Sequence, residues 1–175
     1  MTPSRQLLRH FLAVLAYRTQ KALRGTAATF PEFRAAPNVR TPHEILWHMT
    51  GLIGYASTML RGGEYAPPRV PSFDEEIARF HAMLQSLSDD FADPALHARI
   101  SDEQFLQGPL SDAMTHAGQL AMLRRLEGAP VPSENFIFAQ ISPDNLSADQ
   151  PLPVAPDKWW RPDQPPQPPG PHPPA

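Results

Sequence analysis

The feature that most constrains the fold is a set of four segments in which apolar residues recur at helical spacing. The clearest start signal is TPHE, where Thr41 can cap a helix, Pro42 suits its first position and Glu44 can complete a capping box. SFDE at residues 72–75 repeats this arrangement. We predict helices near residues 4–24, 41–61, 73–90 and 109–127.

Strand signals are weak. NFIFAQI, near residues 135–141, could be extended and pack on the helices. The SDDFADPALHARISDEQFLQG segment before the fourth helix is long enough to cross over the others and could contain a short helical turn. Four amphipathic helices without alternating strands predict an all-α fold, a four-helix bundle.

Proline limits how far this domain extends. Eleven of the last 25 residues are proline, a density that excludes helix and central strand. We therefore predict a helical domain over residues 1–145 and a Pro-rich C-terminal tail over 146–175, extended or disordered. Trp159 and Trp160 are the last residues expected to pack.

Composition narrows the classes of function. The chain has 175 residues and a net charge of −3, with no basic stripe, so no nucleic-acid partner is expected. It has no cysteine, so any metal must be held by histidine, carboxylates and water. No signal peptide or segment of membrane-spanning length is recognisable, which predicts a cytoplasmic protein without a membrane partner.

Three residues form a candidate metal site. Asp112 and His116 lie four apart in SDAMTHAGQLAMLRRLEG, so a helix places both on one face. A carboxylate buried among Leu and Met needs a cation, which either an Asp112–His116 ion pair or a metal would supply. His48, on the inward stripe of the second helix with Leu52 and Tyr55, is the candidate third ligand. Two His and one carboxylate suit Zn²⁺, Ni²⁺, Mn²⁺ or Fe²⁺ and leave coordination positions open.

Other polar residues on these helices have both a functional and a structural interpretation. Gln119 could orient a ligand or simply be an exposed polar residue, and Tyr55 could line the same pocket. His43, in the first turn of its helix, is expected to face solvent. Arg124 and Arg125 are expected to complement the dipole of the fourth helix.

The order of these parts resembles the DinB family, also described as DinB/YfiT-like metalloenzymes. The resemblance covers roughly residues 5–140 and is carried by TPHEILWHMTGLIGYA and GPLSDAMTHAGQLAMLRRLEG. It implies metal ligands at His48, Asp112 and His116, with the family's Gly-Gln pair at Gly118–Gln119. Many members carry His where this chain has Asp112, although a distant relative, mycothiol-dependent maleylpyruvate isomerase, has a carboxylate there.

The resemblance implies a small-molecule transferase or isomerase that uses the metal to deprotonate a low-molecular-weight thiol, and it implies a homodimer. The sequence leaves two alternatives open. One is a metal-dependent hydrolase that activates water. The other is a non-enzymatic helical protein with a vestigial or structural metal site, in which the Pro-rich tail binds a partner.

Overall fold

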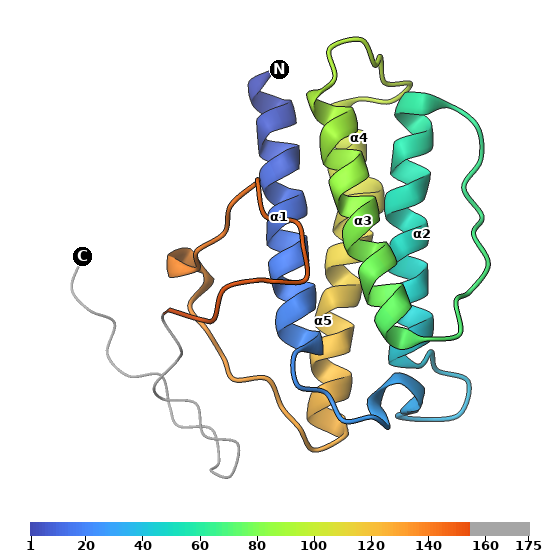
Figure 1. The fold of residues 1–175 in the computed structure, drawn as a ribbon, viewed down its shortest axis with the longest axis vertical. Helices are drawn as coiled ribbons and strands as arrows, with labels where there is room; N and C mark the ends of the chain where they lie inside the picture. The colour runs from blue at the N-terminus through green and yellow to red at the C-terminus, as the bar shows by residue number, and fades with distance from the viewer. Residues whose placement is uncertain (155–175) are drawn as a thin grey trace.

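A computed structural model describes residues 1–154, and this part of the chain is all-helical (Figure 1). Its long helices are α1 (Pro3–Leu23), α2 (Pro42–Arg61), α3 (Phe73–Ala92) and α5 (Ser111–Leu126). The short elements are η1 (Phe30–Glu32), α4 (Asp102–Phe105), η2 (Leu106–Leu110) and η3 (Phe136–Phe138). Residues 1–154 contain no β-strand. Trp159, Trp160 and most of the predicted Pro-rich tail lie outside the described residues.

The helices begin where the predicted caps lie. Thr41 Oγ1 accepts a hydrogen bond from the Glu44 N–H at 3.2 Å, and the Thr41 N–H donates to Glu44 Oε2 at 2.7 Å. This capping box starts α2, whereas α3 begins with a single N-cap bond, in which Ser72 Oγ accepts from the Glu75 N–H at 3.4 Å. The observed bounds of all four long helices agree with the predicted ones within two residues.

The approach to α5 is less regular than the sequence indicates. The crossover segment contains the predicted helical turn, α4, and then the π-type turn η2, in which Gly108 leaves helical geometry at φ −91° and ψ −108°. Regular α-helix begins only at Ser111. Asp112 therefore lies in the first turn of α5, where a carboxylate interacts favourably with the helix dipole.

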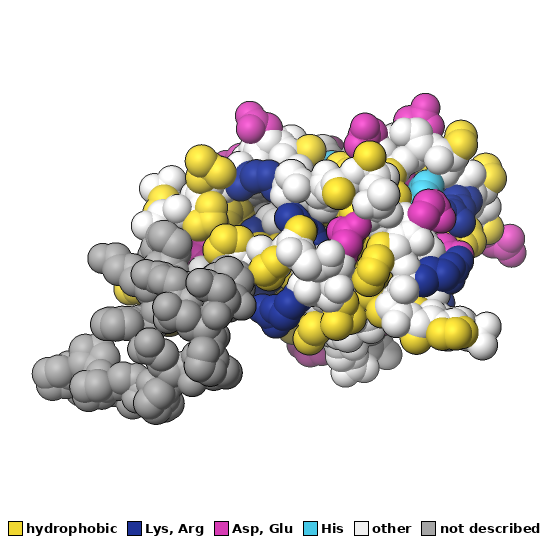
Figure 2. Space-filling view, turned by 90° about the horizontal axis from the view of Figure 1, so that it is seen from below, with side chains coloured by type: hydrophobic (Ala, Val, Ile, Leu, Met, Phe, Trp, Pro, Cys, Tyr) yellow, Lys and Arg dark blue, Asp and Glu magenta, His cyan; other side chains and the backbone are white. Residues whose placement is uncertain are grey.

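The four long helices pack side by side around one core, α2 against α3 and α5, and α1 against α3 and α5. The core is aliphatic and aromatic, and its largest fully buried side chains include Leu12, Phe30, Leu46, Met49, Ile53, Phe80, Leu84, Phe105 and Leu110. Among residues 1–154, no helix is long and apolar enough to cross a membrane. On the face shown in Figure 2, basic and acidic side chains are interspersed.

Two buried carboxylates fix α2 against α3. Thr50 Oγ1 donates to Glu76 Oε1 at 2.6 Å, and Arg79 pairs with the same carboxylate. Further along the same two helices, Ser57 Oγ donates to Asp90 Oδ2 at 2.6 Å. Buried hydrogen bonds at two levels specify the register of the helix pair and therefore the height of His48 on α2.

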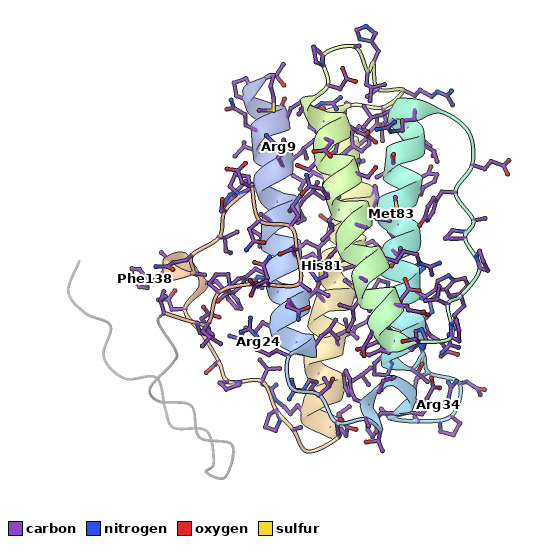
Figure 3. All side chains as sticks on the ribbon, viewed as in Figure 1. Arg9, Arg24, Arg34, His81, Met83 and Phe138 are labelled. Carbon is purple, nitrogen blue, oxygen red and sulfur yellow. The ribbon has the colours of Figure 1, made fainter. Side chains whose placement is uncertain are left out.

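The segment after α5 packs on α1 and α3. Residues 136–138 form a 3₁₀ turn rather than the extended piece that was expected, and Phe136 packs on Tyr17 with ring centroids 6.2 Å apart. Beyond residue 145, Leu146 is buried in the core and its carbonyl accepts from His81 Nδ1 at 2.7 Å. Figure 3 shows His81 beneath this segment and Phe138 pointing away from the helices.

The expectation that His43 faces solvent is wrong. His43 is buried and packs edge-on against Phe73, the first residue of α3, with ring centroids 5.5 Å apart. Burial lowers the pKa of this imidazole, and the charge of Arg69 lowers it further. The start of α3 covers His43, a long-range contact that the local pattern around TPHE does not contain.

Candidate metal centre

The structure brings the three predicted ligands together. His48 lies near the start of α2, and Asp112 and His116 lie one turn apart on α5, which packs against α2. His116 Nε2 lies 3.3 Å from Asp112 Oδ1, and His48 Nε2 lies 3.8 Å from Asp112 Oδ2. The two imidazole rings meet edge to face, with centroids 4.8 Å apart.

These separations suit a metal ion. One ligand atom from each residue can be chosen so that all three lie within 4.8 Å of one another. A tetrahedral metal with bonds of the usual length holds neighbouring N and O donors roughly 3.3–3.6 Å apart. The carboxylate–imidazole distances bracket that range, so His48, Asp112 and His116 could hold a metal ion.

Gln119 determines which nitrogen of His116 faces the centre. His116 Nδ1 donates to Gln119 Oε1 at 2.7 Å, which leaves the Nε2 lone pair directed at the Asp112 carboxylate. Two acceptors at 3.3 Å repel unless a proton or a metal lies between them. A metal ion at the point where the three ligands meet would remove this repulsion, and so would a proton on Nε2 in an Asp112–His116 ion pair. Gln119 is also exposed, so it is both an exposed polar residue and one that orients a candidate ligand.

The site lies nearer the surface than predicted. The Asp112 side chain is 48% exposed and that of His48 33%, against 11% for His116. The α5 residues that join the hydrophobic core include Ala113, Ala117 and Leu120, each one position after a site residue, and His116 is buried at the edge of this core. One residue is about 100° of helix rotation, so the metal centre occupies the face beside the core rather than the core itself. Asp112 is therefore half exposed and not buried among Leu and Met, so the expected desolvation cost of a buried carboxylate does not apply to it.

The surroundings of His48 lower the pKa of its imidazole. Burial lowers its pKa most, the positive charge of Arg40 lowers it further, and His116 adds to this, while Asp112 acts in the opposite direction. Metal ions bind the neutral imidazole, so the surroundings of His48 favour its ligand form.

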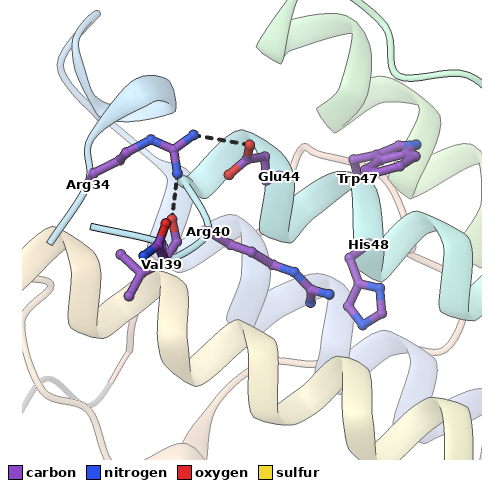
Figure 4. A pocket seen from close by; sticks show the side chains of 7 residues that line it. Arg34, Val39, Arg40, Glu44, Trp47 and His48 are labelled. Carbon is purple, nitrogen blue, oxygen red and sulfur yellow. Dashed lines mark hydrogen bonds and ion pairs between the residues drawn. The ribbon is translucent and has the colours of Figure 1, made fainter. Parts of the chain in front are cut away.

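A pocket of about 360 Å³ opens beside His48 (Figure 4). Its wall comes from the loop before α2 and the first two turns of α2: Arg34, Asn38, Val39, Arg40, Glu44, Trp47 and His48. The loop residues of this wall could not be predicted from the sequence, because an irregular segment carries no periodicity. The only signal was its position directly before a strong helix start.

Two other expectations turn out differently. Tyr55 is 53% exposed and does not belong to the wall of this pocket. Arg124 and Arg125 lie in the last turn of α5, as expected, but Arg124 is also buried and donates to the carbonyls of Ala22 and Arg24 at 3.3 and 2.6 Å, capping the end of α1.

No protein-family model matches the chain, and comparison with curated proteins and with solved structures found no significant match.

Proposed function

We propose that this protein is a divalent-metal-dependent enzyme of the DinB type, with its long helices arranged as the four-helix bundle of that family. The observation that carries the proposal is the convergence of His48, Asp112 and His116, with Gln119 directing the His116 lone pair to the centre. Zn²⁺, Ni²⁺, Mn²⁺ and Fe²⁺ all accept this donor set.

An open centre supports catalysis over a structural role. Three protein ligands leave at least one coordination position, whereas structural zinc sites have four. Asp112 is half exposed and His48 belongs to the pocket wall, so the free position can be reached from solvent. A vestigial site in a non-enzymatic protein would not require the adjoining pocket.

The reaction we propose is transfer of a low-molecular-weight thiol to an electrophile, or isomerisation through the thiol adduct. The metal would supply a cation that favours the thiolate, the reactive form. The chain has no cysteine, so the thiol must arrive as a co-substrate. In this scheme His48, Asp112 and His116 hold the cation, and Gln119 keeps His116 oriented.

Hydrolysis is the weaker candidate because it needs a free general base. The only carboxylate in the pocket wall, Glu44, accepts from the Thr41 N–H and pairs with Arg34 at 3.2 Å. These contacts lower the pKa of Glu44, the Thr41 hydrogen bond most strongly, which makes it a poor proton acceptor.

Metal stoichiometry tests the site. Titration calorimetry with Zn²⁺ should give one equivalent per chain for the wild type and no stoichiometric binding for His48→Ala, which leaves two ligands on one helix. Asp112→Asn should bind more weakly because it removes the only negative charge among the ligands. His97→Ala, an exposed histidine outside the site, is the control and should bind like the wild type.

Activity is tested by a screen of small thiols against electrophiles, with and without chelator. The expected result is conjugation that is lost on chelation and in His48→Ala. Equal metal binding by wild type and His48→Ala would refute the site, while a metal-loaded protein that hydrolyses esters and ignores thiols would refute the thiol chemistry.

A further inference from the structure

Arg40 is the one arginine of the pocket wall whose charge has no partner among residues 1–154. The other, Arg34, donates to the Val39 carbonyl at 2.5 Å and to Glu44 at 3.2 Å (Figure 4). No hydrogen bond or ion pair to the Arg40 side chain is found within the described part of the chain. Because Glu44 is neutralised by Arg34, the pocket wall carries one uncompensated positive charge.

This charge faces the metal centre. Arg40 and His48 both line the pocket, and Figure 4 shows the Arg40 side chain reaching along the wall toward the His48 imidazole. A divalent ion held by Asp112 would add a second net positive charge at the same end. The chain as a whole is negative, at −3, so the local charge is opposite in sign to that of the molecule.

We propose that Arg40 binds a carboxylate of the substrate, so that the pocket takes a small organic acid with a metal-binding group at one end and a carboxylate at the other. The inference rests on the proposed metal site and adds the class of ligand. Arg40 would anchor the acid while His48, Asp112 and His116 hold the ion that meets its other end.

The dimensions and charge of the pocket favour a carboxylate over larger anions. A guanidinium presents two parallel N–H donors that match the two oxygens of a carboxylate. One free arginine balances one negative charge, whereas a phosphate dianion would leave charge unpaired. A volume of about 360 Å³ is at the lower end for ligand sites, which suits a small acid. The partly exposed Trp47 supplies an apolar wall for its carbon chain.

The test compares thiols that differ only in the terminal group. Co²⁺-loaded protein is titrated with 2-mercaptoacetate, 3-mercaptopropionate and 4-mercaptobutyrate, and with the alcohols of matching length, while thiolate binding is followed by the charge-transfer absorption of cobalt. We expect at least one acid to bind about tenfold more tightly than its alcohol, as a charge-assisted hydrogen-bond pair would give.

Variants assign the preference to its residue. Arg40→Gln should reduce the acid-to-alcohol ratio to about one, because the charge and the donor fork are lost, and Arg40→Lys should retain part of it. Arg99→Gln is the control: Arg99 is exposed, does not belong to the pocket wall, and its backbone N–H donates to the Met59 carbonyl near the other end of α2, so the change removes the same charge away from the pocket and should keep the wild-type ratio. Taking ratios within each variant removes the intrinsic acidity of each thiol.

The outcomes separate the two proposals. One equivalent of Co²⁺ in every variant, with equal binding of acids and alcohols by the wild type, would overturn the carboxylate assignment and leave the metal site intact. A preference that survives in Arg40→Gln would overturn it as well. Failure of the wild type to bind Co²⁺ would overturn both.

Discussion

Replacing Gln119 by leucine removes the hydrogen bond that sets the tautomer of His116 and changes little else. The side chain is exposed, and leucine keeps its approximate size and its helix propensity. Without the 2.7 Å contact to Nδ1, the His116 proton can occupy either nitrogen and the ring can rotate. Changes to groups that orient a metal-binding histidine weaken metal binding at least about tenfold, or about 1.4 kcal/mol.

A glutamate at the same position gives the opposite expectation. Gln119→Glu keeps an acceptor for the Nδ1 proton and makes it charged, which increases the basicity of Nε2. The expected order of Zn²⁺ affinity is Gln119→Glu at or above wild type, and Gln119→Leu about tenfold below it. Competition with a chromophoric chelator measures all three dissociation constants.

Thr115→Ala is the matched control, since Thr115 is exposed on the same helix and its hydroxyl donates to the Ser111 carbonyl rather than to the site. Equal affinities for wild type and Gln119→Leu would refute the role of Gln119. An equal loss in Thr115→Ala would show that the effect comes from the helix rather than from His116.

Three further predictions concern the fold and the assembly. Burial lowers the pKa of His81 in the folded protein below its value in the unfolded chain, so the free energy of unfolding should be full above about pH 6.5 and decrease at lower pH. Denaturant unfolding between pH 7 and 5 should show a smaller decrease for His81→Gln than for the control His97→Gln. Gly54→Ala would place a Cβ 2.1 Å from the Tyr65 ring and should destabilise the protein by about 1–3 kcal/mol. Gly51→Ala would meet no atom within 4 Å and should stabilise the protein by up to about 1 kcal/mol; thermal melts measure both changes. We also propose a homodimer, and a light-scattering mass of one chain would contradict it.

The positions of the helices were predictable because their signals are local. Thr41 and Glu44 form their capping box within one turn, and the apolar spacing of α2 depends only on its own residues. The Asp112–His116 pair was predictable for the same reason, as an i, i+4 relation within one helix. The choice of His48 as their partner came from its stripe and from the family resemblance.

The depth of the site was not predictable from α5 alone. The sequence places Asp112 among apolar residues. Which face of α5 packs against α1 and α2, the one with Asp112 or the adjacent one, depends on the rotation of α5 that η2 sets. His43 shows the same limit, since Phe73 covers it from 30 positions further along the chain. Arg40 belongs to a loop whose conformation follows from the Arg34 contacts to Val39 and Glu44 rather than from a repeating pattern.

The segment after α5 is the last described part of the chain to be synthesised, which affects the order in which the fold and the metal site can form. Glu134 accepts from Tyr17 and Lys21 at 2.6 Å, over separations of 117 and 113 residues, and Arg24 reaches the Gln150 carbonyl at 2.5 Å. These contacts join the last described part of the chain to α1, whereas His48, Asp112 and His116 lie on α2 and α5. During synthesis all three ligands therefore emerge before Glu134 does, and none of them is among the residues that these three hydrogen bonds join.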